Sequence, residues 1–140
     1  MVEKQLKFEH PFRIYEIKTN SFSVKDLKSE EAESFSAKDL TFKTRPSFGF
    51  DEELRVIKVS LNISYSYKEE DYLRIDVDTI FEIAEVENLP LQDKNLLATL
   101  LGIAFSTTRG IILTLTVGNF MNKFYLPIIN PSEIIEDSFK

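Results

Sequence analysis

The sequence predicts an α+β domain: a four-stranded antiparallel sheet with one long apolar helix and a short C-terminal helix. Residues 57–67 alternate strictly between apolar and polar side chains, and residues 73–83 follow the same alternation except at Thr79 and Ile80. Residues 96–117 contain a single charged residue and are apolar around most of a helical circumference. A sheet with one apolar face and a helix too apolar for the surface are expected to bury each other. At 140 residues, the chain is predicted to form a single domain over residues 1–140.

The two alternating segments predict adjacent strands of a hairpin. In the first, the odd-numbered residues from Ile57 to Tyr67 are apolar, and the residues between them are polar. Because successive side chains of a strand point to opposite faces, this sheet should be covered on one side only. The residues from Lys68 to Asp71 separate the two segments, which predicts an antiparallel pair with a loop of four or five residues.

Two further strands are predicted before this hairpin. The first covers residues 12–19, where the apolar positions change from even to odd numbers near Tyr15, and this slip predicts a β-bulge. The second contains three phenylalanines on one face between residues 42 and 50, and Pro46 within it favours the edge of the sheet. Residues 20–39 are expected to form a connecting loop. Since no helical crossover separates the four strands, we expect a meander-like order.

The long helix is predicted to begin after Asp93, whose carboxylate can cap the first turn, and to end near Gly118-Asn119. Its single charge, Arg109, is predicted to be structural, paired with an acid or a helix end. A membrane span is disfavoured, because an arginine near its middle costs roughly 2.5–3.5 kcal/mol on insertion scales. Ser132 is predicted to cap the short terminal helix.

The composition leaves little catalytic chemistry available. The chain has no cysteine and one histidine, His10, which excludes disulfides, thiolate metal sites and any mechanism that needs two imidazoles. A net charge of -6 disfavours unselective binding to nucleic acid. The first residues lack the apolar core of a signal peptide, so a cytoplasmic location is expected.

Three acidic residues, Asp76, Asp78 and Glu82, share the polar face of one predicted strand. Their spacing follows from strand alternation alone, and Arg74 and Lys58 supply opposite charges nearby. We therefore predict a solvated cross-strand charge ladder instead of a catalytic or metal site. The protein is expected not to be an enzyme and to need no cofactor and no metal.

The cover of the apolar sheet face is expected to be incomplete. One long and one short helix are a thin cover for four strands, and apolar surface left open indicates a partner or a ligand. Most of the aromatic residues are expected to belong to the core, and some of them are candidates for the lining of an incompletely filled groove. The candidate residues of an incompletely filled groove for such a partner or ligand are Phe42, Phe48, Phe50, Tyr65, Tyr67 and Phe105. The candidate residues of a subunit interface are Phe12, Ile14, Leu97, Leu101 and Ile112.

The order of the predicted elements is distinctive: four antiparallel strands, a long apolar helix, a Leu-Pro extended segment and a terminal helix. This order resembles the SecB family of protein-export chaperones and their SecB-like relatives. The segments that carry the resemblance are residues 78–83, Asn88-Leu89-Pro90, residues 96–104, Arg109-Gly110 and residues 126–131.

The resemblance implies dimers of dimers, in which the long helices lie between two sheets whose outer faces are wet. It also implies clients that bind unfolded, in apolar grooves, without ATP. The predicted function is that of an ATP-independent holdase for non-native polypeptides, serving protein export or a toxin–antitoxin system. A partner-specific adaptor with the same fold is the alternative, and an enzyme or small-ligand carrier is a third possibility. The expected partners are non-native polypeptides and other copies of the chain, without nucleic acid or membrane insertion.

Overall fold

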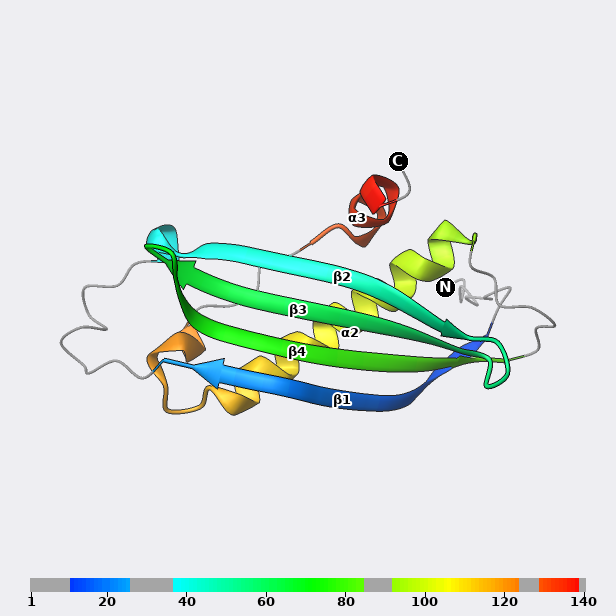
Figure 1. The fold of residues 1–140 in the computed structure, drawn as a ribbon, viewed down its shortest axis with the longest axis horizontal. Coiled ribbons are helices and arrows are strands. Elements are labelled where there is room, and N and C mark those ends of the chain that lie inside the picture. The colour runs from blue at the N-terminus through cyan, green and yellow to red at the C-terminus, as the bar shows by residue number, and fades with distance from the viewer. Residues whose placement is uncertain (1–10, 26–36, 85–91, 124–128, 139–140) are drawn as a thin grey trace, which may run out of the picture.

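The computed structural model describes residues 11–25, 37–84, 92–123 and 129–138. One face of a four-stranded antiparallel sheet is covered by a long helix, and a short C-terminal helix packs on that helix (Figure 1). This arrangement confirms the predicted fold class. The elements are β1 (Phe12–Val24), η1 (Ala37–Asp39), β2 (Thr41–Asp51), β3 (Val56–Tyr67), β4 (Glu70–Ile83), α2 (Lys94–Leu115), η2 (Phe120–Lys123) and α3 (Pro131–Ser138).

The strand order is β1-β4-β3-β2, so the predicted meander order is wrong for β1. Hairpins join β2, β3 and β4, whereas β1 pairs with β4, the last strand in the sequence. Three strands joined by hairpins, with a fourth reached by a long connection, form a Greek key. The connection between β1 and β2 covers residues 25–40, which is far longer than a hairpin loop. This length allows β1 to lie at the opposite edge from β2.

Both edge strands carry the irregularities that the sequence predicts. The register of β1 against β4 skips Tyr15, between Ile14 and Glu16, which confirms the bulge. After the bulge, Ile17 pairs with a residue of the apolar face, so the helix side of β1 changes from even to odd numbers. Pro46 lies in the edge strand β2, as predicted.

The turn between β3 and β4 consists of Lys68 and Glu69 alone, so the predicted loop of four or five residues is too long. Both residues have positive φ angles, 49° and 64°. Two-residue turns of this kind match the twist of the flanking strands and favour asparagine and glycine. Residues with a β-carbon are strained in this conformation.

Replacing Glu69 by glycine is therefore expected to raise the free energy of unfolding by about 1 kcal/mol, because the turn would lose that strain. Urea unfolding followed by circular dichroism measures this change. Glu69→Ala is the matched control, since it removes the same carboxylate and keeps the β-carbon. Equal stabilities of the two variants would contradict the positive φ at this position.

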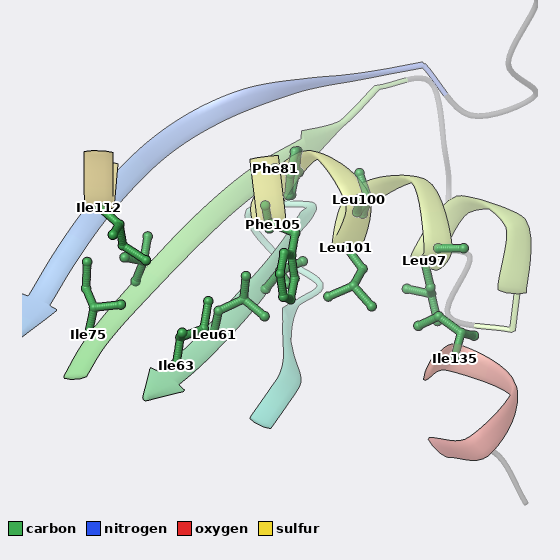
Figure 2. Close-up of a cluster of buried hydrophobic side chains, with 14 of the residues drawn as sticks. Leu61, Ile63, Ile75, Phe81, Leu97, Leu100, Leu101, Phe105, Ile112 and Ile135 are labelled. Carbon is green, nitrogen blue, oxygen red and sulfur yellow. The ribbon is translucent and has the colours of Figure 1, made fainter. Parts of the chain in front are cut away.

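The core lies between α2 and the central strands. α2 crosses the apolar face of the sheet diagonally and packs mainly on β3 and β4 (Figure 1). Among the described residues, one helix, α2, is long and apolar enough to cross a membrane. Half of its most apolar stretch is buried inside the protein. Figure 2 shows the buried side chains between the layers, which include Leu61, Ile63, Ile75, Phe81, Leu97, Leu100, Leu101, Phe105, Ile112 and Ile135.

The two α-helices, α2 and α3, each begin at a side chain that caps the first turn. The carboxylate of Asp93 accepts a hydrogen bond from the backbone N–H of Leu96 at 3.1 Å, which confirms the predicted cap of α2. In α3 the capping residue is Asn130, whose side-chain oxygen accepts from the N–H of Ser132 at 3.1 Å. The prediction of Ser132 as the cap is wrong, because Pro131 suits the first helical position, where its missing N–H is not needed.

Candidate functional site

The apolar face of the sheet is covered at its centre and only partly at its edges. The apolar residues of β3 and β4 are buried beneath α2. On β2, Phe42 and Phe48 are half-buried, and on β1, Ile14 and Ile17 are 44% and 43% exposed. A strip of partly exposed apolar side chains therefore runs along each edge strand.

We define two such surfaces. The β2 strip consists of Phe42, Phe48, Phe50 and Leu54, and the β1 strip consists of Phe12, Ile14, Tyr15 and Ile17.

The six residues predicted for the groove do not form one group. The ring of Phe42 lies at a tilt against that of Tyr65, with centroids 5.4 Å apart, and meets the ring of Phe105 edge to face at 6.3 Å. Tyr65 and Phe105 are buried, so they form the floor beneath the partly exposed Phe42. Tyr67 belongs to a separate contact with Tyr72, at 6.0 Å.

The most accessible apolar side chains of the β2 strip lie toward its C-terminal end. Phe48 is half-buried and Phe50 is 48% exposed. In the following turn, Leu54 is 65% exposed, and sequence reasoning missed this residue. Its backbone N–H donates to the carboxylate of Asp51 at 3.1 Å, which fixes the turn. An apolar residue in an otherwise charged turn was the available signal.

The residues predicted for a subunit interface fall into two classes. Phe12 is half-buried and its ring meets that of Phe81 edge to face, with centroids 6.0 Å apart. Ile14 is substantially exposed. The structure also exposes Tyr15 and Ile17, which were not among the predicted residues. The remaining three residues are buried within a single chain and leave almost no side-chain surface for another subunit: Leu97, Leu101 and Ile112.

The predicted structural residue Arg109 lies on α2, half-buried, within electrostatic reach of Tyr65 on β3. Burial raises the pKa of Tyr65 to about 12, and the positive charge of Arg109 opposes this shift by lowering the pKa. The phenol is therefore neutral throughout the physiological range.

This pKa predicts a loss of stability in alkaline solution. The folded pKa of Tyr65 is about 12 and its ordinary value is 10.0, so the folded state holds this proton more tightly. The corresponding stability is fully present below pH 10 and is lost as the pH rises from 10 to 12. Urea unfolding at several pH values measures the slope. Tyr65→Phe should flatten this slope, and a slope unchanged from that of the parent protein would contradict the assignment.

The carboxylates of the wet sheet face bond to neutral side chains. Asp76 accepts a hydrogen bond from the hydroxyl of Ser21 at 2.5 Å and another from the amide of Asn62. Asp78 accepts from the amide of Asn20 at 2.8 Å. Asp76 is therefore held by uncharged donors from both neighbouring strands, and Asp78 by one uncharged donor from β1.

The predicted charge ladder is therefore wrong for Arg74 and Lys58, which take no part in the ion pairs of the described residues. Glu82 alone of the three acids has a cationic partner, Arg13, at 2.9 Å. Within the described ranges, no group of three or more acidic, histidine or cysteine side chains is arranged to hold a metal ion.

Comparison with known proteins finds a similar structure but no similar sequence. No protein-family model matches the sequence, and no curated protein is significantly similar to it in sequence. The structure is similar to that of the Mycobacterium tuberculosis SecB-like chaperone Rv1957, solved in complex with a ChAD peptide from the HigA1 antitoxin. The TM-score is 0.54 at 15% sequence identity, over 84% of this chain and 90% of that chain. The chain therefore has the fold of the SecB-like chaperones, as the order of its elements predicted.

Proposed function

We propose that the protein is a cytoplasmic, ATP-independent holdase that binds extended apolar segments of non-native polypeptides. The observation that carries this proposal is the incomplete cover of the apolar sheet face. Several exposed apolar side chains near one another, such as Phe50 and Leu54, favour an interaction site in a folded protein. Its position along the edge strands suits an extended chain, whose side chains repeat on one side every 6.8 Å or so.

The β2 strip is the proposed client surface. Phe50 and Leu54 offer exposed apolar side chains, and Phe42 and Phe48 offer partly exposed ones above a buried aromatic floor. Complete burial of one such side chain contributes roughly 1.5–3 kcal/mol, so a few contacts are enough for reversible binding. The structural neighbour Rv1957 was solved with a bound peptide, which supports peptide binding as a use of this fold.

The β1 strip is the proposed surface for self-assembly into a dimer or tetramer. β1 is an edge strand of 13 residues with no further strand beside it among the described residues. Its free edge offers unpaired backbone groups, and its apolar side chains are partly exposed. The outward side of α2 offers a second surface, because the helix carries no charge between Lys94 and Arg109.

The test is suppression of aggregation of an unrelated protein as it is thermally unfolded. We expect suppression at a one-to-one molar ratio without ATP. Phe50→Ser combined with Leu54→Ser should abolish most of it, because both side chains are exposed and their loss leaves the core intact. Val117→Ser is the matched control, since Val117 is exposed at the far end of α2. If the parent protein, the double variant and the control variant suppressed aggregation equally, the β2 strip would not be the client surface.

A partner-specific adaptor is the second candidate function, and the single antitoxin peptide bound to Rv1957 favours it. The two candidates differ in selectivity. A holdase should bind most members of a panel of unfolded polypeptides with similar affinity, whereas an adaptor should bind one and ignore the rest. Fluorescence anisotropy with labelled unfolded chains separates these outcomes.

A further inference from the structure

The β2 strip lies on an edge strand that carries a proline at its centre. β2 runs from Thr41 to Asp51 and pairs only with β3, so no strand lies on its outer side among the described residues (Figure 1). Pro46 is the middle one of its 11 residues. A free strand edge can accept an extended peptide as a further strand, so β2 is a candidate for such pairing with a client. The backbone direction at Pro46 decides whether this pairing is possible.

The sheet register shows that the backbone of Pro46 faces outward. β2 pairs with β3 residue by residue without a register shift, and Pro46 lies opposite Leu61. In an antiparallel pair, the backbone groups of successive residues point alternately toward the neighbouring strand and away from it. Proline has no N–H, so a ladder that continues unbroken past Pro46 takes no donor from it. The backbone of Pro46 therefore points away from β3, as do those of the other even-numbered residues of β2.

The outward-facing backbone groups belong to the residues that also form the strip. Phe42, Phe48 and Phe50 are even-numbered and lie on either side of Pro46. A client chain beside β2 would meet their N–H and C=O groups, together with those of Thr44. Pro46 interrupts this row of donors between Thr44 and Phe48. The strip therefore offers apolar side chains on both sides of Pro46, but no continuous row of backbone donors.

A client that paired along the whole of β2 would lack a hydrogen bond opposite Pro46. One of its carbonyl oxygens would be removed from water without a donor, which costs at least as much as one backbone hydrogen bond contributes. The proline ring also fills the space in front of the backbone nitrogen, so the client chain cannot approach as closely there. On each side of Pro46, β2 keeps only two outward-facing residues, so pairing confined to one side gains few hydrogen bonds.

The opposite edge of the sheet differs in this respect. β1 has 13 residues, none of which is proline, and its two register shifts change the local spacing without removing an N–H group. Bulges and charged side chains can protect an edge from aggregation and leave its backbone donors in place. A proline removes a donor and so acts against any chain that pairs with the strand, including a client. The edge proposed for self-assembly keeps its donors, and the edge proposed for clients does not.

We propose that Pro46 prevents a client from adding a strand to β2, so that the client is held on the β2 strip by its apolar side chains alone. This role of Pro46 rests on the proposed function, because it concerns the same client surface. A client without backbone pairing dissociates faster than one that is joined to the sheet by a ladder of hydrogen bonds. Pro46 therefore keeps client binding reversible, which a holdase without ATP requires.

The test compares the release of two probes. One is a labelled peptide in which leucine alternates with serine. The other is its ester analogue, which has the same side chains but has ester bonds in place of the peptide bonds and therefore no N–H donor. Fluorescence anisotropy during competition with unlabelled peptide gives the dissociation rates. The parent protein should release both probes at rates that agree within about twofold, because neither probe pairs with the backbone of β2.

Pro46→Ala restores the missing donor, so it should slow the release of the peptide roughly two- to tenfold. It should affect the ester analogue much less, because that probe has no N–H and only weakly accepting carbonyl groups. Pro46→Val, whose side chain suits a strand, should have the same effect as Pro46→Ala. Ser47→Ala is the matched control, since Ser47 is exposed on the wet face and its backbone points toward β3. This control should release both probes as the parent does.

Two outcomes would overturn the proposal and leave the proposed function standing. Much faster release of the ester analogue than of the peptide by the parent protein would show that clients pair with β2 in spite of Pro46. Equal release of the peptide by the parent and by both Pro46 variants would show that this proline does not limit pairing. A parent protein that binds neither probe and does not suppress aggregation would contradict the proposed function itself.

Discussion

Replacing Phe105 by alanine is expected to lower the free energy of unfolding by about 3–5 kcal/mol. The side chain is 2% exposed and lies between α2 and the sheet (Figure 2). Its ring meets that of Phe42 edge to face, with centroids 6.3 Å apart. Its removal takes away the apolar burial and leaves a cavity between two packed layers that cannot collapse freely. Since a domain of this size is stable by about 5–15 kcal/mol, the variant should be close to unfolding at room temperature.

Urea unfolding followed by the helical circular dichroism signal measures this loss. Ser106→Ala is the control, because Ser106 is exposed on the next position of α2 and its replacement should change stability by about 0.5 kcal/mol or less. A loss below about 1 kcal/mol in Phe105→Ala would show that α2 is not docked as described.

The second large effect is expected on assembly. Ile14→Lys combined with Ile17→Lys should convert the proposed dimer or tetramer into monomers, because both side chains are partly exposed on the helix side of the edge strand β1. Two added charges would have to be buried wherever β1 strips of two subunits meet. Both positions are solvent-accessible in a single chain, so the monomer itself should remain folded.

Light scattering coupled to size-exclusion chromatography measures the change in mass. The control is Ser23→Lys, which adds a charge to the same strand on its wet face, opposite Arg74. It should leave the assembly intact. A monomeric parent protein, or an assembly that tolerates the two lysines, would contradict the assignment of β1 to self-association.

The sequence predicts the parts of this fold that depend on local pattern. The alternation in β3 and β4 identifies the apolar residues that are buried on the helix side of the sheet, but it does not identify Thr79, Ser64 and Ser66 as buried. The bulge at Tyr15 is visible because the alternation changes phase there. The cap at Asp93 follows from its position before an apolar helix. Each of these features is determined by neighbouring residues in the chain.

Features that depend on distant contacts were not predictable in the same way. The pairing of β1 with β4 joins the first and last strands, and no property of either strand distinguishes it from pairing with β2. The tight turn at Lys68 and Glu69 lacks the asparagine and glycine that usually mark such turns. The strand pairing and the turn conformation both depend on how the whole sheet packs, which the residues of one segment do not determine.

The exposure of the candidate site residues also depends on distant contacts and was only partly predictable from the sequence. Helical periodicity identifies Leu97 and Leu101 as apolar, but it does not say whether they meet the sheet of their own chain or another subunit. Phe50 was identified by its place on β2, and Leu54 was missed because a lone apolar residue in a turn belongs to no periodic pattern. Exposure depends on the position of α2, which only the assembled structure gives.

The most direct test of the central claim is calorimetric titration with one polypeptide in two states, permanently unfolded and native. We expect binding to the unfolded state only, with a negative change in heat capacity, because apolar surface is buried when the client covers the β2 strip. Phe50→Ser with Leu54→Ser should reduce both the affinity and the heat-capacity change. Equal binding to the native state, or binding without a heat-capacity change, would contradict the account.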